Sequence, residues 1–286
     1  MKSKKIKTIV ITALTGCMLL AVTVSASASG ASGYETYKSA VRELVTTRNA
    51  TFSTSFEVKD NGNTDISGNS VEKLEGTNSS SNIEVKIGDV TKDTETSRVD
   101  GKIVIKEGDN YYSMGNSAKG NIGRGNRKID ASSSRAKLGE MVLDTLVGDV
   151  KNQFVVDGDE ISVKLEGAQI PELAKLAISA AVEEQNDKKS YNKGEFANDE
   201  LRKAISDIPT LKNVDIKSLS LTAKVDGNTL SENDVKIVIA GEDEKGVSHE
   251  FELSANTAVS NVNSTKADSI DTTGKQVQTM GNKRSK

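Results

Sequence analysis

Hydrophobic and polar residues alternate along much of this 286-residue chain with the two-residue period of a half-buried β-strand. The turn sequences Asp60-Asn61-Gly62, Asp157-Gly158 and Asp226-Gly227-Asn228 separate neighbouring runs, and Asn-Gly and Asp-Gly pairs favour tight hairpin turns. The pattern predicts antiparallel hairpins, with a three-stranded meander in the last third of the chain. The alternating runs are 52–58, 83–87, 102–114, 153–157, 160–167, 219–225, 235–239 and 247–255.

Other segments have the three-to-four-residue spacing of an amphipathic helix. In the first of them, Tyr34, Tyr37 and Val41 fall on one helical face, and Pro171 suits the first turn of another. The expected fold is therefore α+β, with a curved, half-barrel-like antiparallel sheet and several helices packed on one of its faces. The predicted helices are 34–47, 135–148, 171–185 and 196–206.

The first 28 residues have the three parts of an export signal, namely four lysines, an apolar run and a small-residue Ala26-Ser27-Ala28 cleavage site. Cys17 offers an alternative, because Leu14-Thr15-Gly16-Cys17 resembles a lipobox whose cysteine carries a lipid anchor. The apolar run continues past Cys17, which favours release after Ala28. We expect a signal peptide at 1–28, a single domain at 29–263 and a polar C-terminal tail at 264–286 that frays.

The amino-acid composition argues against several classes of function. Removal of the four signal lysines leaves 34 basic and 41 acidic residues, which is not the charge of a general nucleic-acid-binding protein. Cleavage after Ala28 also removes Cys17, the one cysteine, and with it any disulfide or thiolate chemistry. Aromatic residues make up 3% of the chain, which disfavours a sugar-binding module built on stacking platforms. The expected location is extracellular or in the cell envelope.

The order of helix, long meander, helices and final meander resembles the LolA/LppX-like class of bacterial envelope proteins, including uncharacterised Gram-positive members. This resemblance implies a half-open barrel with an apolar, lipid-sized cavity between sheet and helices, and it carries no catalytic residues. The stretches that carry it are 34-YETYKSAVREL-44, 146-LVGDVKNQFVVDGD-159, 167-GAQIPELAKLA-177 and 268-DSIDTTGKQV-277.

Catalysis and metal binding have few candidate residues. His249 is the one histidine, and in 247-VSHEFEL-253 it shares a face with Val247 and Phe251 as a packed strand residue would. No second histidine completes a zinc site, and no G-x-S-x-G nucleophile motif is present. The acidic stretches 60–65, 157–160 and 242–244 do not have the order of a calcium-binding loop and indicate solvated turns. We therefore expect no enzyme activity, no metal and no cofactor.

Two binding sites are predicted. The glycine-rich loop 120-GNIGRGNRK-128 resembles an anion-holding concavity, although its default role is a connecting loop. The apolar stripes of two predicted helices are core by default, and would line a ligand cavity if the fold leaves one. The anion-contact candidates are Lys119, Arg124, Arg127 and Lys128, and the ligand-lining candidates are Leu138, Met141, Val142, Leu146, Leu173, Leu176 and Ala180.

Together these observations favour an exported, non-enzymatic protein that binds a lipid or another apolar molecule between sheet and helices. The alternative is an extracellular interaction or scaffold domain that meets a protein or an anionic wall polymer. An internal apolar cavity would separate the two, because a carrier needs space for its cargo.

Overall fold

The computed structural model describes residues 32–114, 148–172, 175–176, 209 and 211–280. These residues form one twelve-stranded sheet in the order β12-β6-β5-β4-β3-β2-β1-β11-β10-β9-β8-β7. Neighbouring strands are antiparallel, except that β12 runs parallel to β6. The strands are β1 Asn49–Asp60, β2 Asn63–Glu75, β3 Asn78–Ile87, β4 Val90–Val99, β5 Lys102–Glu107, β6 Asn110–Met114, β7 Val155–Asp157, β8 Glu160–Glu166, β9 Lys212–Asp226, β10 Thr229–Glu242, β11 Ser248–Ser260 and β12 Val277–Met280.

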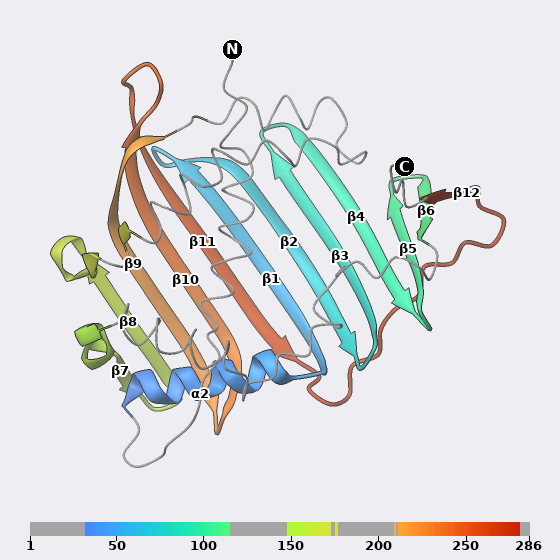
Figure 1. Cartoon of the computed structure of the whole chain (residues 1–286), viewed down its shortest axis with the longest axis horizontal. Coiled ribbons are helices and arrows are strands. Elements are labelled where there is room, and N and C mark those ends of the chain that lie inside the picture. Colours follow the sequence, from blue (N-terminus) through green and yellow to red (C-terminus); the bar gives the residue numbers. More distant parts are fainter. Residues whose placement is uncertain (1–31, 115–147, 173–174, 177–208, 210, 281–286) are drawn as a thin grey trace, which may run out of the picture.

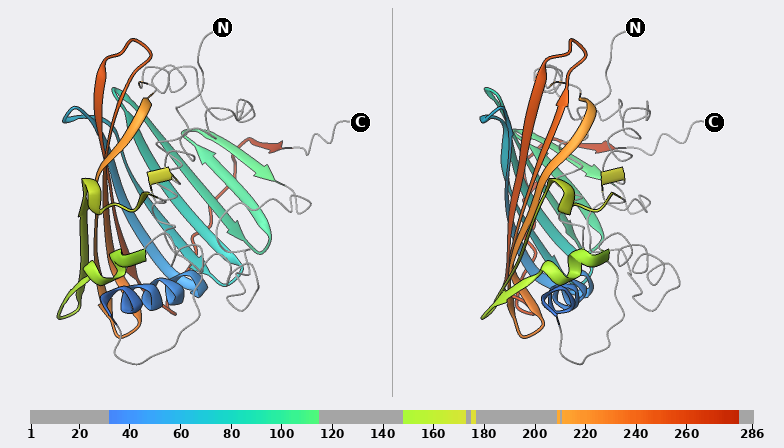
Figure 2. Two further views of the ribbon diagram at one scale, coloured as in Figure 1. Left: turned by 60° about the vertical axis from the view of Figure 1, so that its left-hand side comes forward. Right: turned by 90° about the vertical axis from the view of Figure 1, so that its left-hand side faces the viewer.

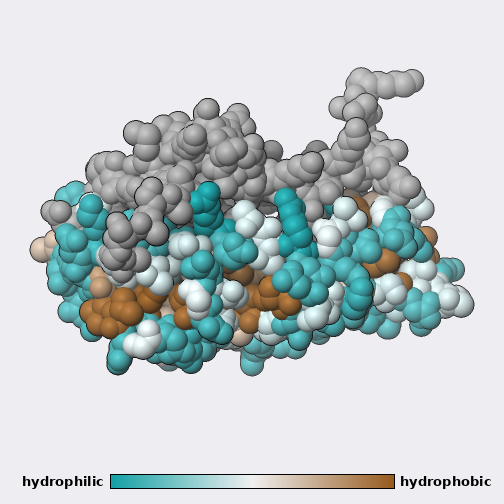
Figure 3. All heavy atoms as spheres, turned by 90° about the horizontal axis from the view of Figure 1, so that it is seen from below, coloured by the Kyte–Doolittle hydropathy of each residue, from teal (hydrophilic) through white to brown (hydrophobic). Residues whose placement is uncertain are grey.

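The sheet is open and curved. Its two edges, β7 and β12, are not paired with one another. Figures 1 and 2 show the strands side by side in one bent layer, with the helix α2 (Gly33–Thr46) lying across strand ends on the concave side. Seen from the end at which α2 lies, the surface is mostly hydrophilic, with separate hydrophobic patches (Figure 3).

The predicted balance of helix and sheet is wrong, because the described fold is largely β. Its helical parts are α2, two short 3-10 segments, η2 (Gly148–Gln153) and η3 (Gly167–Gln169), and the described residues 172, 175 and 176 at the start of the predicted helix 171–185, where the Lys175 amide donates to the Pro171 carbonyl at 3.0 Å. The predicted strands and turns are present, but the sheet also includes 63–81 and 91–99, which are mostly polar. Backbone pairing with neighbours holds these strands in the sheet, so hydrophobic alternation underestimates the β content. The predicted helices 135–148, 171–185 and 196–206 lie almost entirely outside the described residues.

The helix α2 forms as its sequence predicts. The Ser32 side chain caps its first turn by accepting a hydrogen bond from the Glu35 amide. Tyr37, Ala40 and Val41 lie on its buried face and join a core cluster with β8, β9 and β10. The Tyr37 hydroxyl donates to Asn233 on β10 at 3.2 Å, and burial raises the pKa of this phenol far above its usual value. α2 therefore covers one flank of the concave face.

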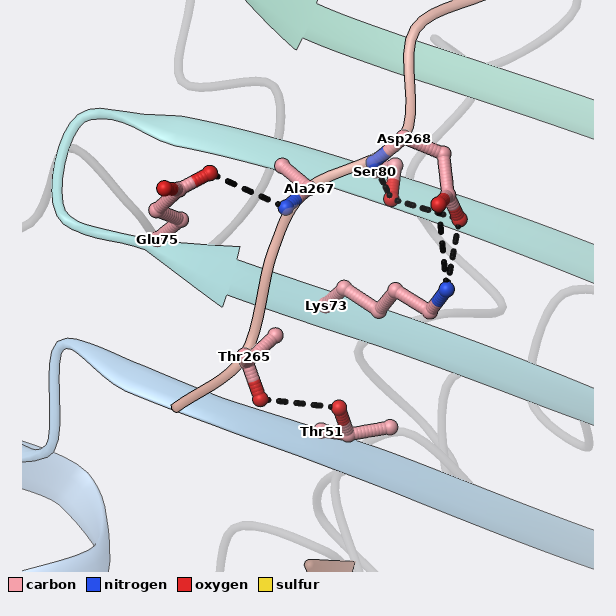
Figure 4. Close-up of polar contacts among 7 residues, drawn as sticks. All are labelled: Thr51, Lys73, Glu75, Ser80, Thr265, Ala267 and Asp268. Atoms are coloured by element: carbon pink, nitrogen blue, oxygen red, sulfur yellow. Dashed lines mark hydrogen bonds and ion pairs between the residues drawn. The ribbon is translucent and has the colours of Figure 1, made fainter. Parts of the chain in front are cut away.

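The C-terminal segment does not fray over its described length. After β11, residues 261–276, the C-terminal strap, cross the ends of β1 to β4 and lead into β12. The Oγ1 atoms of Thr265 and Thr51 lie 2.9 Å apart, and both residues are buried (Figure 4). Thr51 alternates with Ala50 and Phe52, which pack toward Leu44 of α2, so the strap lies on the opposite, convex face.

Candidate functional site

The concave face carries a second apolar cluster next to the flank that α2 covers. We call it the apolar floor, and all of its members are buried, with Val58 and Ile66 at 0% and 1% exposure. Among the described residues, Leu211 is the neighbour that packs on it from outside the strands. The floor consists of Val58 on β1, Ile66 on β2, Ile87 on β3, and Phe251, Leu253 and Ala255 on β11.

A glycine shapes the middle of this surface. Gly68 on β2 lies directly opposite Phe56 on β1, and the Phe56 ring packs over the bare backbone. A Cβ at position 68 would stand 2.5 Å from the ring and 2.4 Å from the carbonyl oxygen of Glu84. Glycine is therefore required here by close approach. Phe56 packs against the floor and extends it along β1.

At the tips of β1, β2 and β11 the floor is bordered by a set of polar side chains, which we call the polar end. His249 Nδ1 lies 2.7 Å from Asp60 Oδ2, and the ring stacks on Phe251 of the floor with centroids 6.0 Å apart. The side chains of His249 and Asp60 are 12% and 15% exposed. Within the described residues, His249 Nε2 and Asp60 Oδ1 are buried atoms without a hydrogen-bond partner. Two further acids complete this polar end, Asp65 and Asp243.

The two further acids respond differently to this environment. Burial, assisted by the nearby Asp60 carboxylate, raises the pKa of Asp65. Backbone amides of Val247 and Lys245 donate to Asp243 and lower its pKa. Asp243 thus closes the β10–β11 turn, with its Oδ2 4.0 Å from His249 Nε2. Among the described residues, no group of three or more His, Cys, Asp or Glu residues is placed to hold a metal ion.

The convex face has a different character. A shallow hollow of about 430 Å³ lies over β1, β11, β10 and β9. Several of the polar side chains that line it are paired, for example Asn256 with Asp234 at 2.6 Å and Lys236 with Glu252 at 2.7 Å.

Most of the predicted site residues lie outside the part of the chain that the structure describes. Cys17 and the anion-contact candidates Lys119, Arg124, Arg127 and Lys128 lie outside the described residues. Among the ligand-lining candidates, Leu176 is described, and it is 62% exposed. The candidates Leu138, Met141, Val142, Leu146, Leu173 and Ala180 also lie outside the described residues.

The sequence did not predict the contact between His249 and Asp60. The histidine was placed correctly on the face of Phe251, but Val247 precedes the strand and is 51% exposed. Asp60 pairs directly with Phe251 across β1 and β11, 191 positions apart. A hairpin pattern does not reveal such a distant pairing, so no local signal could have found the pair.

Comparisons with known proteins do not assign the chain to a family. No protein-family model matches the chain, and no curated protein matches it. A Thermobifida fusca protein assigned provisionally to thioesterase II is 10% identical over 83% of this chain and 89% of its own, with a TM-score of 0.13. This likeness is too low to carry an argument about fold or function. In the described residues, no helix is both long and apolar enough to cross a membrane.

Proposed function

We propose that this protein is an exported, non-enzymatic envelope protein that binds an amphiphilic molecule on its concave face. The observation that supports the proposal is the apolar floor, which lies on an open, curved sheet and ends at the polar group around His249. The resemblance to the LolA/LppX-like class favours the same kind of ligand. The export signal predicted at 1–28 favours a location outside the cytoplasm.

The two parts of the site suit the two parts of an amphiphile. Because the side chains of the floor are themselves buried, the gain comes from the apolar chain of the ligand, whose removal from water is favourable by about 25 cal/mol for each Å². The buried, unpaired atoms Asp60 Oδ1 and His249 Nε2 would gain hydrogen bonds from a polar headgroup. Because α2 already fills the flank over β8 to β10, the chain is expected along β1, β2, β3 and β11.

Native mass spectrometry of the protein purified from its own producing cells tests this proposal directly. An additional mass of several hundred daltons that is lost on denaturation is the expected result, and its value identifies the ligand class. A protein that carries no such mass and takes up no amphiphile when one is added would contradict the proposal. The denatured mass also distinguishes a start after Ala28 from a lipid-bearing start at Cys17.

Paired substitutions locate the site. Phe56→Ala and Leu253→Ala remove apolar surface from the concave face, and each is expected to raise the Kd for N-phenyl-1-naphthylamine about tenfold. Ser55→Ala and Ser254→Ala are the matched controls, because these neighbours point to the convex face and should leave the Kd unchanged. Circular dichroism confirms that each variant is folded. An equal effect of both pairs would place the ligand elsewhere.

A second candidate function is an extracellular interaction domain, which an open sheet edge favours. β7 pairs only with β8 among the described residues, and its Val155 and Val156 are 61% and 51% exposed. Figure 3 shows a hydrophobic patch on the side where Figure 1 places β7 and β8. An exposed edge strand can accept a strand from a partner. A bare protein in the native mass measurement would make this the favoured function.

A further inference from the structure

The C-terminal strap is bound by its backbone, one strand after another. It crosses the convex face, and each of the first four strands supplies one side-chain oxygen that accepts a strap amide. Figure 4 shows two of these bonds, from Ala267 to Glu75 and from Asp268 to Ser80. Such bonds fix the path of the chain rather than the identity of its side chains. The four bonds are Thr265 N to Asn49 Oδ1 at 2.7 Å, Ala267 N to Glu75 Oε2 at 3.1 Å, Asp268 N to Ser80 Oγ at 2.9 Å and Ile270 N to Ser97 Oγ at 3.3 Å.

Side chains of the strap reinforce this row. The Asp268 carboxylate lies 2.8 Å from Lys73 Nζ, and Lys266 donates to Glu75. Ser97 and Thr265 are each 3% exposed, so the strap seals the polar atoms beneath it. Buried polar atoms that lost these partners would have to be solvated again. The strap is therefore a seated element rather than a loose tail.

Beyond the strap lies a part of the sheet with little apolar support. β5 and β6 are six and five residues long, and their buried Ile103 and Val104 belong to none of the three core clusters of the described residues. The strap leads into β12, which pairs with β6, so that Val277 lies opposite Tyr111. The Lys275 ammonium lies 5.7 Å from the centre of the Tyr111 ring. This flank is thus held by its ladder and by the C-terminal segment.

We infer that residues 261–280 act as a latch that keeps the β5–β6 flank closed against the rest of the sheet. Release of the strap from β1 to β4 removes the tether of β12, and β5 and β6 can then separate from β4 by local opening. That opening widens the concave face on its β6 side. The consequence for a ligand rests on the function proposed above, whereas the latch itself does not.

Hydrogen exchange of the ligand-free protein tests the latch. The variant Glu75→Ala/Asp268→Ala removes the acidic partners of Lys266, Ala267 and Lys73. Amides of 102–114 are expected to exchange about tenfold faster, while those of β9 and β10 keep their rates. Unchanged exchange in 102–114 would overturn the inference.

The matched control is Glu166→Ala/Asp215→Ala. It removes the same charge and two exposed ion pairs, with Lys164 and Lys217, on the opposite flank. Faster exchange of 102–114 in this control as well would show a general loss of stability and would overturn the latch.

A covalent version covers the case in which the double variant fails to fold. The Oγ1 atoms of Thr51 and Thr265 are adjacent, so Thr51→Cys/Thr265→Cys can be oxidised to lock the strap or reduced to free it. Slower exchange of 102–114 in the oxidised form supports the latch, and equal exchange overturns it. If the reduced form takes up N-phenyl-1-naphthylamine faster than the oxidised form, the latch also controls ligand access to the concave face. If even the wild type binds no amphiphile, the proposed function fails while the exchange result stands.

Discussion

At the scale of single residues, Glu75 accepts hydrogen bonds from two neighbouring strap residues. The Lys266 ammonium and the Ala267 amide lower the pKa of this carboxyl below its ordinary value of 4.5. An acid whose pKa is lowered by folding contributes stability above its unfolded pKa, and this contribution is lost as the pH falls through the folded pKa. We predict that Glu75→Gln is less stable than the wild type near neutral pH and that the difference closes under acid conditions.

Urea unfolding at a series of pH values measures this difference. Lys266→Gln removes the same pair from the other side, so it should show the same closing difference. A gap between wild type and Glu75→Gln that stays constant from neutral to acid pH would contradict the role of the Glu75 charge.

The His249–Asp60 pair gives a second prediction at this scale. His249→Ala leaves the Asp60 carboxylate, 15% exposed, without its donor, and the expected cost is about 1–3 kcal/mol in the free energy of unfolding. Because the two side chains bond to one another, Asp60→Ala/His249→Ala should lower the free energy of unfolding by less than the sum of the single changes. A double-mutant cycle by urea unfolding measures the coupling. Strict additivity would show that the pair contributes nothing beyond its separate contacts.

At the scale of elements, the docking of α2 depends on a small residue. Ala40 is fully buried on the face that packs on the sheet, with Tyr37 and Val41 beside it. We predict that Ala40→Leu overfills this interface and costs about 1–3 kcal/mol of stability. Glu43→Leu adds leucine to an exposed position of the same helix and should change stability little. Equal thermal shifts in the two variants would contradict the observed packing.

The elements that the sequence predicts well are those whose signal is local. Period-two alternation found the meander of β9, β10 and β11, and Asn61-Gly62 marked a turn in which both residues have positive φ. The polar strands from 63 to 81 have no such alternation, and their ladders with neighbours are decided by the assembled sheet. The tail from residue 264 was predicted to fray because it is polar, yet four of its amides donate hydrogen bonds to side chains of four strands.

The candidate site was predictable only in part for the same reason. The apolar members of β11 were identified through their alternation, and His249 was placed beside them. Their joining with Val58 and Ile66 depends on β1 pairing with β11, whose residues are about 200 positions away. Leu176, which helical spacing suggested as a lining residue, is 62% exposed, and its role in ligand binding stays a prediction.

At the scale of the whole molecule, the three apolar clusters are linked through shared neighbours. Ile239 on β10 packs against both the α2-side cluster and the apolar floor. Leu44 of α2 joins the α2-side cluster to the group formed by Ala50, Phe52 and Leu74. A continuous core of this kind couples β8, β9 and β10 to β1, β2, β3 and β11, so this part of the sheet should unfold as one cooperative unit.

Ile239 is the link through which that coupling can be tested. Ile239→Ala removes side-chain atoms that touch both clusters, and we predict a loss of about 2 kcal/mol together with a less cooperative melt. Scanning calorimetry gives both results, since the ratio of van't Hoff to calorimetric enthalpy should be near one in the wild type and lower in the variant. Ile83→Ala is the matched control, because Ile83 is 39% exposed and belongs to none of the three clusters. If Ile239→Ala lowers stability but keeps the wild-type ratio, the clusters are coupled by the backbone ladder of the sheet and not by this side chain.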